Sequence, residues 1–290
     1  MTAGCSENVR AEQPPKRAAK AKTLPETLTL DLGKGATMKL VLIPAGDFLM
    51  GGKFSAAEAI KRFGGNPNHY QSELPRHKVT ISRPFYMGIY EVTQSQWESL
   101  MDSKPYDGKM ATKTGPDYPA SWVHSNEAME YCGKLSKKIG KTVTLPTEAQ
   151  WEYACRAGSD TVFCYGDDPK KISDYGWWHG NMIDNDKGKT YTRKGGLKKP
   201  NAWGLYDMHG NAWEWCRDWY SKDFYASGEN VDPEYTKETK LRTARGGSWY
   251  NGSIHMRSAA RNSWTGPNYR HYNYGFRVVV ECDTSANGEP

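Results

Sequence analysis

The stretch LPTEAQWEYACRAG, residues 145–158, is followed further along the chain by GLYDMHGNAWEW, residues 204–215. In the first stretch, Thr147 stands three residues before Gln150, which is the spacing of a capping box that begins a helix. Gly158 stands where that helix should end, because glycine readily adopts the left-handed conformation at a helix C-terminus. The stretch therefore predicts a short helix between Thr147 and Gly158.

Two more helices are predicted from the same kinds of signal. Thr93 and Gln96 form a second capping box. Between residues 125 and 140, apolar side chains recur on one helical face, and Gly140 supplies the stop. That face comprises Ala128, Tyr131, Cys132, Leu135 and Ile139.

Short strands are predicted where apolar residues alternate or run between turn signals. Residues 38–52, MKLVLIPAGDFLMGG, read as two strands around a proline turn and as the start of the globular part. Further strands are expected over residues 79–82, 85–92, 245–249, 255–261 and 275–281. Residues 56–77 are expected to form a loop with about one helical turn, and 159–201 a long loop. The chain is thus predicted to be of the α+β class.

The composition indicates one loop-rich domain with a core built from large rings. The 290 residues are 37% hydrophobic, yet they include 11 Trp and 18 Tyr, together with 29 Gly and 16 Pro. Tryptophan and tyrosine bury much area but need a partner for their N–H or O–H groups. We therefore expect few long elements and many side-chain hydrogen bonds.

The net charge is +6, but lysines are interleaved with acids rather than clustered. This pattern is typical of a solvated surface and does not indicate a nucleic-acid partner. No apolar run reaches about 18 residues, so no transmembrane segment is predicted.

The ends of the chain differ from its middle. Residues 1–27 are polar, rich in lysine and interrupted by proline, and are predicted to be disordered. Residues 28–282 are assigned to the domain and 283–290 to a tail. The residues TAGC, ending at Cys5, resemble the end of a bacterial lipoprotein signal, although no apolar segment precedes them. Two interpretations stay open: a lipid anchor at Cys5 on an envelope protein, or a chance likeness in a cytoplasmic one.

The order of motifs resembles that of the formylglycine-generating enzyme, or sulfatase-modifying factor, family. The motifs are LIPAGDFLMGG, ELPRHKVTISRPFYMGIYEVTQSQW, LPTEAQWEYACRAG, GLYDMHGNAWEW, ARGGSW, RSAARN and YGFRVV. The likeness covers about residues 38–280. It implies a single compact domain with little regular secondary structure, similar to a variant C-type lectin fold. Because such a fold hosts several functions, the site residues must decide among them.

The family's oxidases convert a sulfatase cysteine to formylglycine with copper held by two thiolates in the stretch after GGS(F/W). Here that stretch is YNGSIHM, residues 250–256, and it contains no cysteine. Ser253 and Asn251 stand nearest to the two expected positions. Thiolates select Cu(I), and a hydroxyl or amide is a poor substitute. Copper is therefore not expected, and the chain is predicted to be catalytically inactive; an oxidase with altered ligands is the alternative.

The resemblance also bears on iron and on disulfides. The family's iron enzymes need a histidine cluster, and no two of the seven histidines show i,i+4 spacing. Cysteines resembling Cys132 and Cys155 pair, in the enzymes, with positions that look like Val278 and Ser258 here, so those bonds cannot form. Whether Cys164 and Cys216 pair with something else is left open.

Calcium is the expected cofactor. In the family, the residues that resemble Asn211 and Glu214 hold calcium, and hard oxygens suit that ion. The alternative is a capped turn with two buried tryptophans and no ion. A second calcium site, carried by the loop HGNMIDNDKGKTY, has Asn181, Asp184 and Asp186 as candidates.

The C-terminal region is expected to form a binding surface for a protein or peptide. Aromatic, arginine and asparagine side chains on a rigid scaffold are typical anchors of interfaces. The alternatives are that some of these side chains belong to the core, as expected for Trp249 and Phe276, or that the region is retroelement-diversified. The candidates are Tyr250, Asn251, His255, Arg257, Trp264, Tyr269, His271, Tyr272 and Tyr274.

Overall fold

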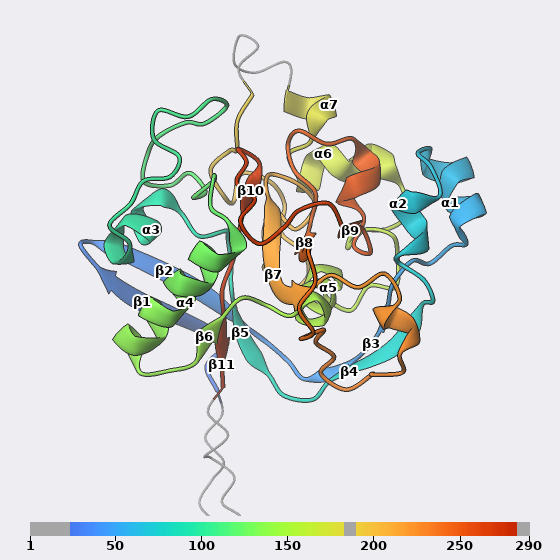
Figure 1. The fold of residues 1–290 in the computed structure, drawn as a ribbon, viewed down its shortest axis with the longest axis horizontal. Coiled ribbons are helices and arrows are strands. Elements are labelled where there is room, and N and C mark those ends of the chain that lie inside the picture. Colours follow the sequence, from blue (N-terminus) through green and yellow to red (C-terminus); the bar gives the residue numbers. More distant parts are fainter. Residues whose placement is uncertain (1–23, 183–189, 283–290) are drawn as a thin grey trace, which may run out of the picture.

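The structure is a computed structural model that describes residues 24–182 and 190–282. Its largest sheet has five antiparallel strands, and the last strand of the chain lies inside it (Figure 1). Their order is β1 (Thr27–Gly33), β2 (Ala36–Ile43), β5 (Phe85–Gly88), β11 (Val279–Glu281) and β6 (Val143–Thr144). Because β11 pairs with both β5 and β6, it ties the C-terminal region to the first half of the domain.

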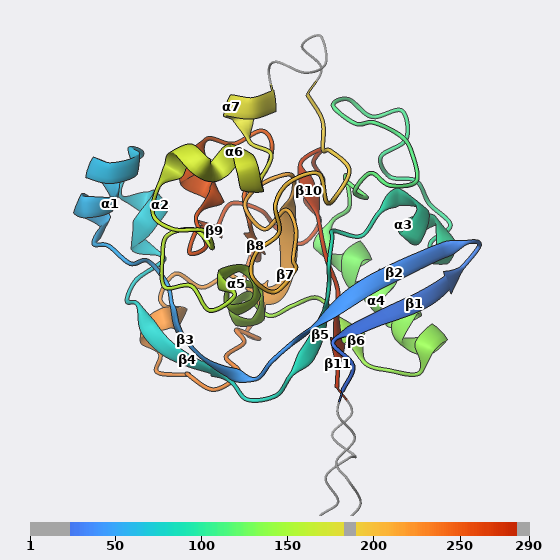
Figure 2. The ribbon, with the colours of Figure 1, turned by 180° about the vertical axis from the view of Figure 1, so that it is seen from behind.

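Strand β1 was missed among the predicted strands, the first of which began at residue 38, although it lies almost wholly within the segment 28–282 that was assigned to the domain. Its residues TLTLDLG alternate, with Leu30 and Leu32 buried and the threonines and aspartate outward. This period of two is the pattern of a half-buried strand. The strand pairs with β2 in a hairpin that crosses one side of the molecule (Figure 2).

A second sheet has four strands and includes short strands of the C-terminal region. Its order is β10 (Tyr274–Gly275), β7 (Trp213–Trp219), β8 (Arg242–Arg245) and β9 (Arg261–Asn262). A separate pair joins β3 (Gly46–Met50) to β4 (His77–Ile81). The predicted strands over 245–249 and 255–261 are wrong in extent: Gly246 and Gly247 turn with positive φ, and Ser253–Met256 form a 3-10 helix, η3.

The three predicted helices are present, but the one that begins after Thr147 has Ala157 rather than Gly158 as its left-handed C-cap. They are α3 (Gln94–Leu100), α4 (Ser125–Ile139) and α5 (Glu148–Arg156). Thr93 and Thr147 complete their capping boxes, and Gly140 is left-handed at φ 66°. Helices α3 and α4 pack on the five-stranded sheet, whereas α5 contacts β7, β8 and β3.

Residues 56–77 contain more helix than expected. They form α1 (Ala56–Phe63) and α2 (Asn68–Gln71), and α1 begins with a capping box of Ser55 and Glu58 that the sequence analysis missed. The predicted long loop over 159–201 also holds short helices. These are η1 (Pro169–Lys171), α6 (Ile172–Tyr175) and α7 (His179–Met182); η2 (Phe224–Ala226) follows later in the chain.

The core is built from large rings, as the composition predicts, and many of their polar atoms are bonded, although the hydroxyl of Tyr131 and the indole nitrogen of Trp249 have no hydrogen-bond partner among the described residues. Trp97 stacks on Tyr131 with ring centroids 5.8 Å apart, and Phe276 meets Tyr131 edge-on at 5.4 Å. The indole nitrogen of Trp97 donates to the carbonyl of Ser103 at 2.7 Å, and that of Trp215 to Val123 at 2.9 Å. Within the described part of the chain, every helix is too short or too polar to cross a lipid bilayer.

Candidate functional site

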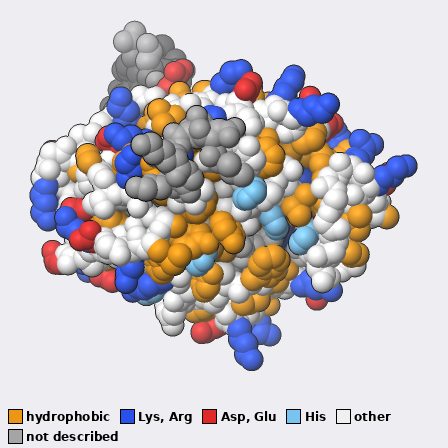
Figure 3. All heavy atoms as spheres, turned by 90° about the horizontal axis from the view of Figure 1, so that it is seen from above, with side chains coloured by type: hydrophobic (Ala, Val, Ile, Leu, Met, Phe, Trp, Pro, Cys, Tyr) orange, Lys and Arg blue, Asp and Glu red, His pale blue; other side chains and the backbone are white. Residues whose placement is uncertain are grey.

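The nine C-terminal candidates for a binding surface come together around one pocket of about 260 Å³. They share its walls with eight further residues, including His69 from α2 and Trp213 from β7. Three of them stand at its rim, since Tyr250, Trp264 and Tyr269 are 53%, 68% and 40% exposed. Seen from above, this side of the molecule shows hydrophobic side chains gathered beside histidines (Figure 3).

Part of the predicted surface belongs to the core, as the alternative interpretation held. Tyr274 and Arg257 are only 4% and 5% exposed, and they form the base of the pocket rather than its rim. Trp249 and Phe276, expected to be core residues, are 2% and 0% exposed. The pocket is therefore a depression in a packed scaffold and not a loose loop surface.

One wall of the pocket is a set of interlocked rings. Tyr272 lies 5.3 Å from Trp249, 5.6 Å from Tyr250 and 3.7 Å from His271, measured between ring centroids. Tyr269 stacks on His271 at 5.7 Å. Because each ring is held by another ring, this wall is ordered before any ligand arrives.

The other wall contains a residue that the sequence analysis missed. His69 meets His255 at 5.3 Å and Trp264 at 6.4 Å, and His255 lies 6.0 Å from Trp213. Burial, followed by the charge of Arg257, lowers the pKa of His69. Burial, followed by His69 and Arg257, lowers the pKa of His255 to about 4. No local pattern marks His69, because its pocket partners lie far away in the sequence.

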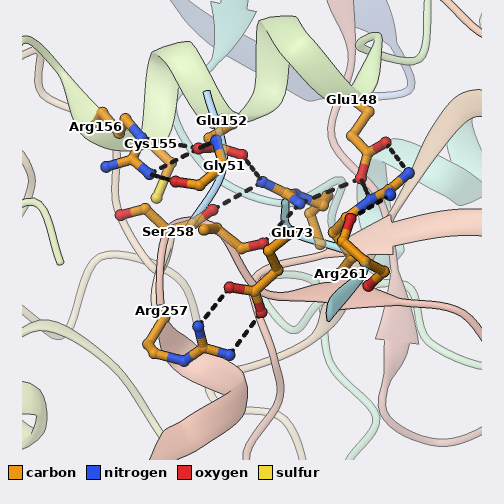
Figure 4. Close-up of polar contacts among 12 residues, drawn as sticks. Gly51, Glu73, Glu148, Glu152, Cys155, Arg156, Arg257, Ser258 and Arg261 are labelled. Carbon is orange, nitrogen blue, oxygen red and sulfur yellow. Dashed lines mark hydrogen bonds and ion pairs between the residues drawn. The ribbon is translucent and has the colours of Figure 1, made fainter. Parts of the chain in front are cut away.

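The base of the pocket rests on buried ion pairs (Figure 4). Arg257 donates to both carboxylate oxygens of Glu73 at 2.6 and 2.7 Å. Arg261 does the same to Glu148 at 2.7 and 2.8 Å. All four side chains are less than a tenth exposed. Each pocket arginine is therefore fixed in place and electrically balanced by its own carboxylate.

A second layer of charge lies behind this base. Arg245 reaches both Glu148 and Glu152, and Glu152 also accepts from Arg156 at 2.7 and 2.9 Å. Burial raises the pKa of Glu152, but Arg156 and Arg245 outweigh it and leave the pKa below its usual value. Helix α5 thus supplies Glu148, which positions the pocket residue Arg261, whereas Arg257 is positioned by Glu73 from outside this helix.

The pocket wall contains no thiol among its lining residues. Asn251 accepts from the indole nitrogen of Trp213 at 2.8 Å and from the hydroxyl of Ser248 at 2.5 Å, so its oxygen holds the wall together. Ser253 begins η3. The positions expected to correspond to the copper-binding pair therefore carry an amide and a hydroxyl.

The cysteines within the described residues are free thiols. They are Cys132, Cys155, Cys164, Cys216 and Cys282. Ser258 interacts with the thiol of Cys155, and Val278 lies in the same core cluster as Cys132, in keeping with the prediction that these pairs form no disulfide. Cys164 and Cys216, whose pairing was left open, form no disulfide among the described residues, which do not include Cys5. Burial raises the pKa of Cys155 to about 12, so this thiol is unreactive.

Asn211 and Glu214 do not offer free oxygens to a common ion. Glu214 accepts from Arg277 at 2.6 and 2.7 Å and from the indole nitrogen of Trp151 at 2.7 Å. The side-chain oxygen of Asn211 accepts from the backbone N–H of Arg193 at 2.7 Å. As a two-residue ligand set, the predicted pair does not fit calcium.

Two acids that the sequence analysis missed lie beside Glu214. Glu91 and Asp207 are each 1% exposed, and one oxygen of each has no hydrogen-bond partner within the described chain. Burial raises the pKa of Asp207 to about 6, and burial with the charges of Asp207 and Glu214 raises the pKa of Glu91 well above its usual value. Three carboxylates thus surround the guanidinium of Arg277. In the sequence, each of these acids stands within an otherwise apolar stretch: Glu91 in YEV and Asp207 in LYDM. This placement was the available signal that the two carboxylates are buried.

These unpartnered oxygens are what fits a hard cation such as calcium. Over residues 24–182 and 190–282, no three side chains of His, Cys, Asp or Glu form a metal-ligand group. An ion here would therefore also use backbone carbonyl oxygens. At the second predicted site, Asn181 accepts from the N–H of Trp178 and donates to the carbonyl of Gly176, both at 2.9 Å, so it closes a turn. Asp184 and Asp186 lie outside the described residues.

Fold and pocket together define a loop-rich α+β domain of C-type lectin-like type. The Sulfatase-modifying factor enzyme 1-like domain matches residues 29–282, so the chain belongs to the sulfatase-modifying factor family. It is 28% identical to the formylglycine-generating enzyme of Bos taurus over 302 residues, covering 84% of this chain and 75% of that enzyme. PvdO from Pseudomonas aeruginosa is 30% identical, with a TM-score of 0.74 over 90% of this chain and all of that one. Treponema denticola variable protein 1 shares the fold, with a TM-score of 0.73 at 23% identity over 89% of this chain and all of that one.

Proposed function

We propose that this chain is a non-catalytic member of its family that binds a protein or peptide through the C-terminal pocket. The observation that carries the proposal is the composition of the pocket wall: aromatic rings, histidine, asparagine and balanced arginine, with no cysteine among the lining residues. Rigid aromatic side chains on an ordered scaffold are what binding surfaces use as anchors. A copper oxidase needs thiolates at the place where Asn251 and Ser253 stand.

The alternative is an oxidase with altered ligands, and kinship with the bovine formylglycine-generating enzyme favours it. We expect no such activity. Incubation with copper, oxygen and a peptide carrying Cys-x-Pro-x-Arg should leave the cysteine thiol unmodified in the mass spectrum. Repeated turnover to the aldehyde, at a rate above that of free copper, would show that the alternative is right.

The binding role is tested by truncating one wall of the pocket. In a variant with Tyr250→Ala, His271→Ala and Tyr272→Ala, we expect affinity for a captured partner to fall roughly thirtyfold, since an anchor ring contributes about 2 kcal/mol or more. The measurement is a pull-down followed by titration of the purified partner. Thermal unfolding of the variant establishes that the domain is still folded.

A matched control carries three alanines in place of exposed apolar residues away from the pocket. Met110, Leu197 and Val231 are 70%, 61% and 65% exposed, and none of them lines the pocket. The control triple should retain the partner with the affinity of the unaltered chain. If both triple variants lose affinity for the partner equally, or if neither loses any, the partner uses another surface.

A further inference from the structure

The first feature that limits what the pocket can hold is the lack of a free charge on its walls. Its lining residues include no aspartate or glutamate. Arg257 donates from Nε to the carbonyl of Ile254 and from both Nη atoms to the carboxylate of Glu73. Arg261 is engaged in the same way by Glu148 and the carbonyl of Ser72. An anionic group would have to displace a buried carboxylate, so the pocket does not suit an anion.

A cationic group is disfavoured for a different reason. The charge of Arg257 lowers the pKa of both His69 and His255, in addition to the effect of burial. A field that opposes a proton on these rings also opposes a ligand ammonium or guanidinium at the same place. Glu73, which pairs with Arg257, offsets only part of this effect at His69, and no carboxylate lines the pocket to pair with a ligand cation. The chemistry left is that of an uncharged group.

Shape and surface favour a single ring. The cavity of about 260 Å³ is smaller than the sites of roughly 300–1,000 Å³ that hold drug-sized molecules. Trp264 leaves 68% of its surface open beside it, and the rings of His255 and Trp264 lie 6.2 Å apart, nearly perpendicular at 81°. A ring entering here would meet faces and edges at the spacing that aromatic pairs prefer.

The wall also offers one polar contact for the edge of that ring. Neither ring nitrogen of His255 has a hydrogen-bond partner among the residues that the structure describes, and its ring is packed against those of His69, Trp213 and Trp264. A neutral imidazole carries one donor and one acceptor. It can therefore bond to a phenol hydroxyl or accept from an indole N–H.

We propose that the pocket receives an uncharged aromatic side chain with a polar edge, a tyrosine or tryptophan of the partner, which packs on Trp264 and bonds to His255. This inference rests on the proposed function, since it names the group that the binding surface recognises. It assigns two roles on the wall: Trp264 supplies ring contact, and His255 discriminates tyrosine from phenylalanine.

The test selects peptides from a random library on the immobilised full chain. The variant with alanine at Met110, Leu197 and Val231 serves as a reference that identifies peptides bound outside the pocket. Each selected peptide is labelled, and its affinity is measured by fluorescence anisotropy. We expect one tyrosine or tryptophan whose replacement by alanine costs tenfold or more. Replacing that tyrosine by phenylalanine should cost several-fold, and replacing it by lysine or phosphotyrosine should abolish binding.

Variants of the protein complete the test. Trp264→Ala should lower the affinity for the selected peptide tenfold. The His255→Phe variant should bind the tyrosine and phenylalanine peptides with equal affinity. His255→Gln keeps a donor and an acceptor, so it should restore the preference for tyrosine. If His255→Phe discriminates as well as the unaltered chain does, the role given to His255 is wrong.

The outcomes separate this inference from the function on which it rests. Peptides that lose affinity in the Tyr250, His271 and Tyr272 triple but depend on a charged or aliphatic residue would refute the inference and leave the function standing. If no selected peptide is sensitive to that triple, the proposed function fails as well. Pocket-dependent binding on a glycan array, without such peptides, would replace both with carbohydrate recognition.

Discussion

At the scale of single residues, the local chemistry of a side chain was easier to predict than its partners. Asn251 and Ser253 were identified from the motif; Asn251 lines the pocket, and Ser253 begins η3. His69 was not identified, because it reaches His255 from a distant helix. The same reason hid Glu91, which reaches Glu214 from a distant part of the chain, whereas Asp207 stands in the same motif as Glu214 and was not singled out.

His209 shows how a buried residue can make stability depend on pH. Its Nδ1 bonds to the carbonyl of Met256 at 2.7 Å, and its Nε2 accepts from the N–H of Cys164 at 3.0 Å. Burial lowers its pKa to about 4, so the folded state keeps the neutral ring while the unfolded state binds a proton near pH 6.5. The stability contributed by the neutral ring is present above pH 6.5 and is lost as the pH falls towards 4.

We predict that this loss amounts to about 3 kcal/mol between pH 7 and pH 4. His209→Gln removes the titrating ring, so urea unfolding of this variant should change less over the same range than that of the unaltered chain. The comparison isolates His209, because buried Asp218, with its pKa raised to about 7, acts in the opposite direction in both proteins. Parallel curves for the two proteins would show that His209 is not the group responsible.

At the scale of elements, helices with explicit caps were predictable and strands without alternation were not. The capping boxes of α3 and α5 and the glycine stop of α4 are signals within a few residues, and all three helices formed. Strand β7 is buried along most of its length, so its residues WEWCRDW show no alternation of the kind that marked β1. Its place in a sheet depends on β8 and β10, which come later in the chain.

Helix α5 links this local signal to the pocket, since it carries Glu148 and Glu152. The hydroxyl of Thr147 accepts from the N–H of Gln150 at 3.0 Å, and the side chain of Gln150 accepts in return from the N–H of Thr147 at 2.9 Å. We predict that Thr147→Ala costs about 1 kcal/mol and lowers the melting temperature by roughly 2–4 °C.

Thr147→Ser keeps the hydroxyl and should melt within a degree or so of the unaltered chain, as differential scanning calorimetry can show. Peptide affinity at the pocket should not change in either variant, because the folded geometry of the arginines is the same. A loss of affinity without a loss of stability would mean that the cap positions the pocket directly.

At the scale of the whole molecule, the fold is held together where segments distant in sequence meet. Strand β11 lies between β5 and β6, and the C-terminal pocket takes a wall from α2. The family resemblance predicted the single domain, but no pattern in the sequence predicts this order of strands. The cluster of Glu91, Asp207, Glu214 and Arg277 lies at such a meeting point, since it joins three separate parts of the chain.

Calcium at this cluster is the last prediction, and it concerns the stability of the whole domain. Two buried oxygens without hydrogen bonds, one on Glu91 and one on Asp207, leave a negative charge that a cation or protons must balance within the described structure. An ion that binds only the folded state stabilises it by mass action. A chelator should therefore lower the melting temperature of the unaltered chain, and calcium in excess, but not magnesium, should restore it.

Asp207→Asn keeps the size of the side chain and removes its charge, so this variant should respond less to both chelator and calcium. Lys78→Gln is a control at an exposed ion pair, and it should respond as the unaltered chain does. Equal responses in all three proteins would place the ion elsewhere. No response in any of them would mean that protons balance the cluster; in that case its carboxylates would make the domain less stable as the pH rises through about 6, where Asp207 titrates.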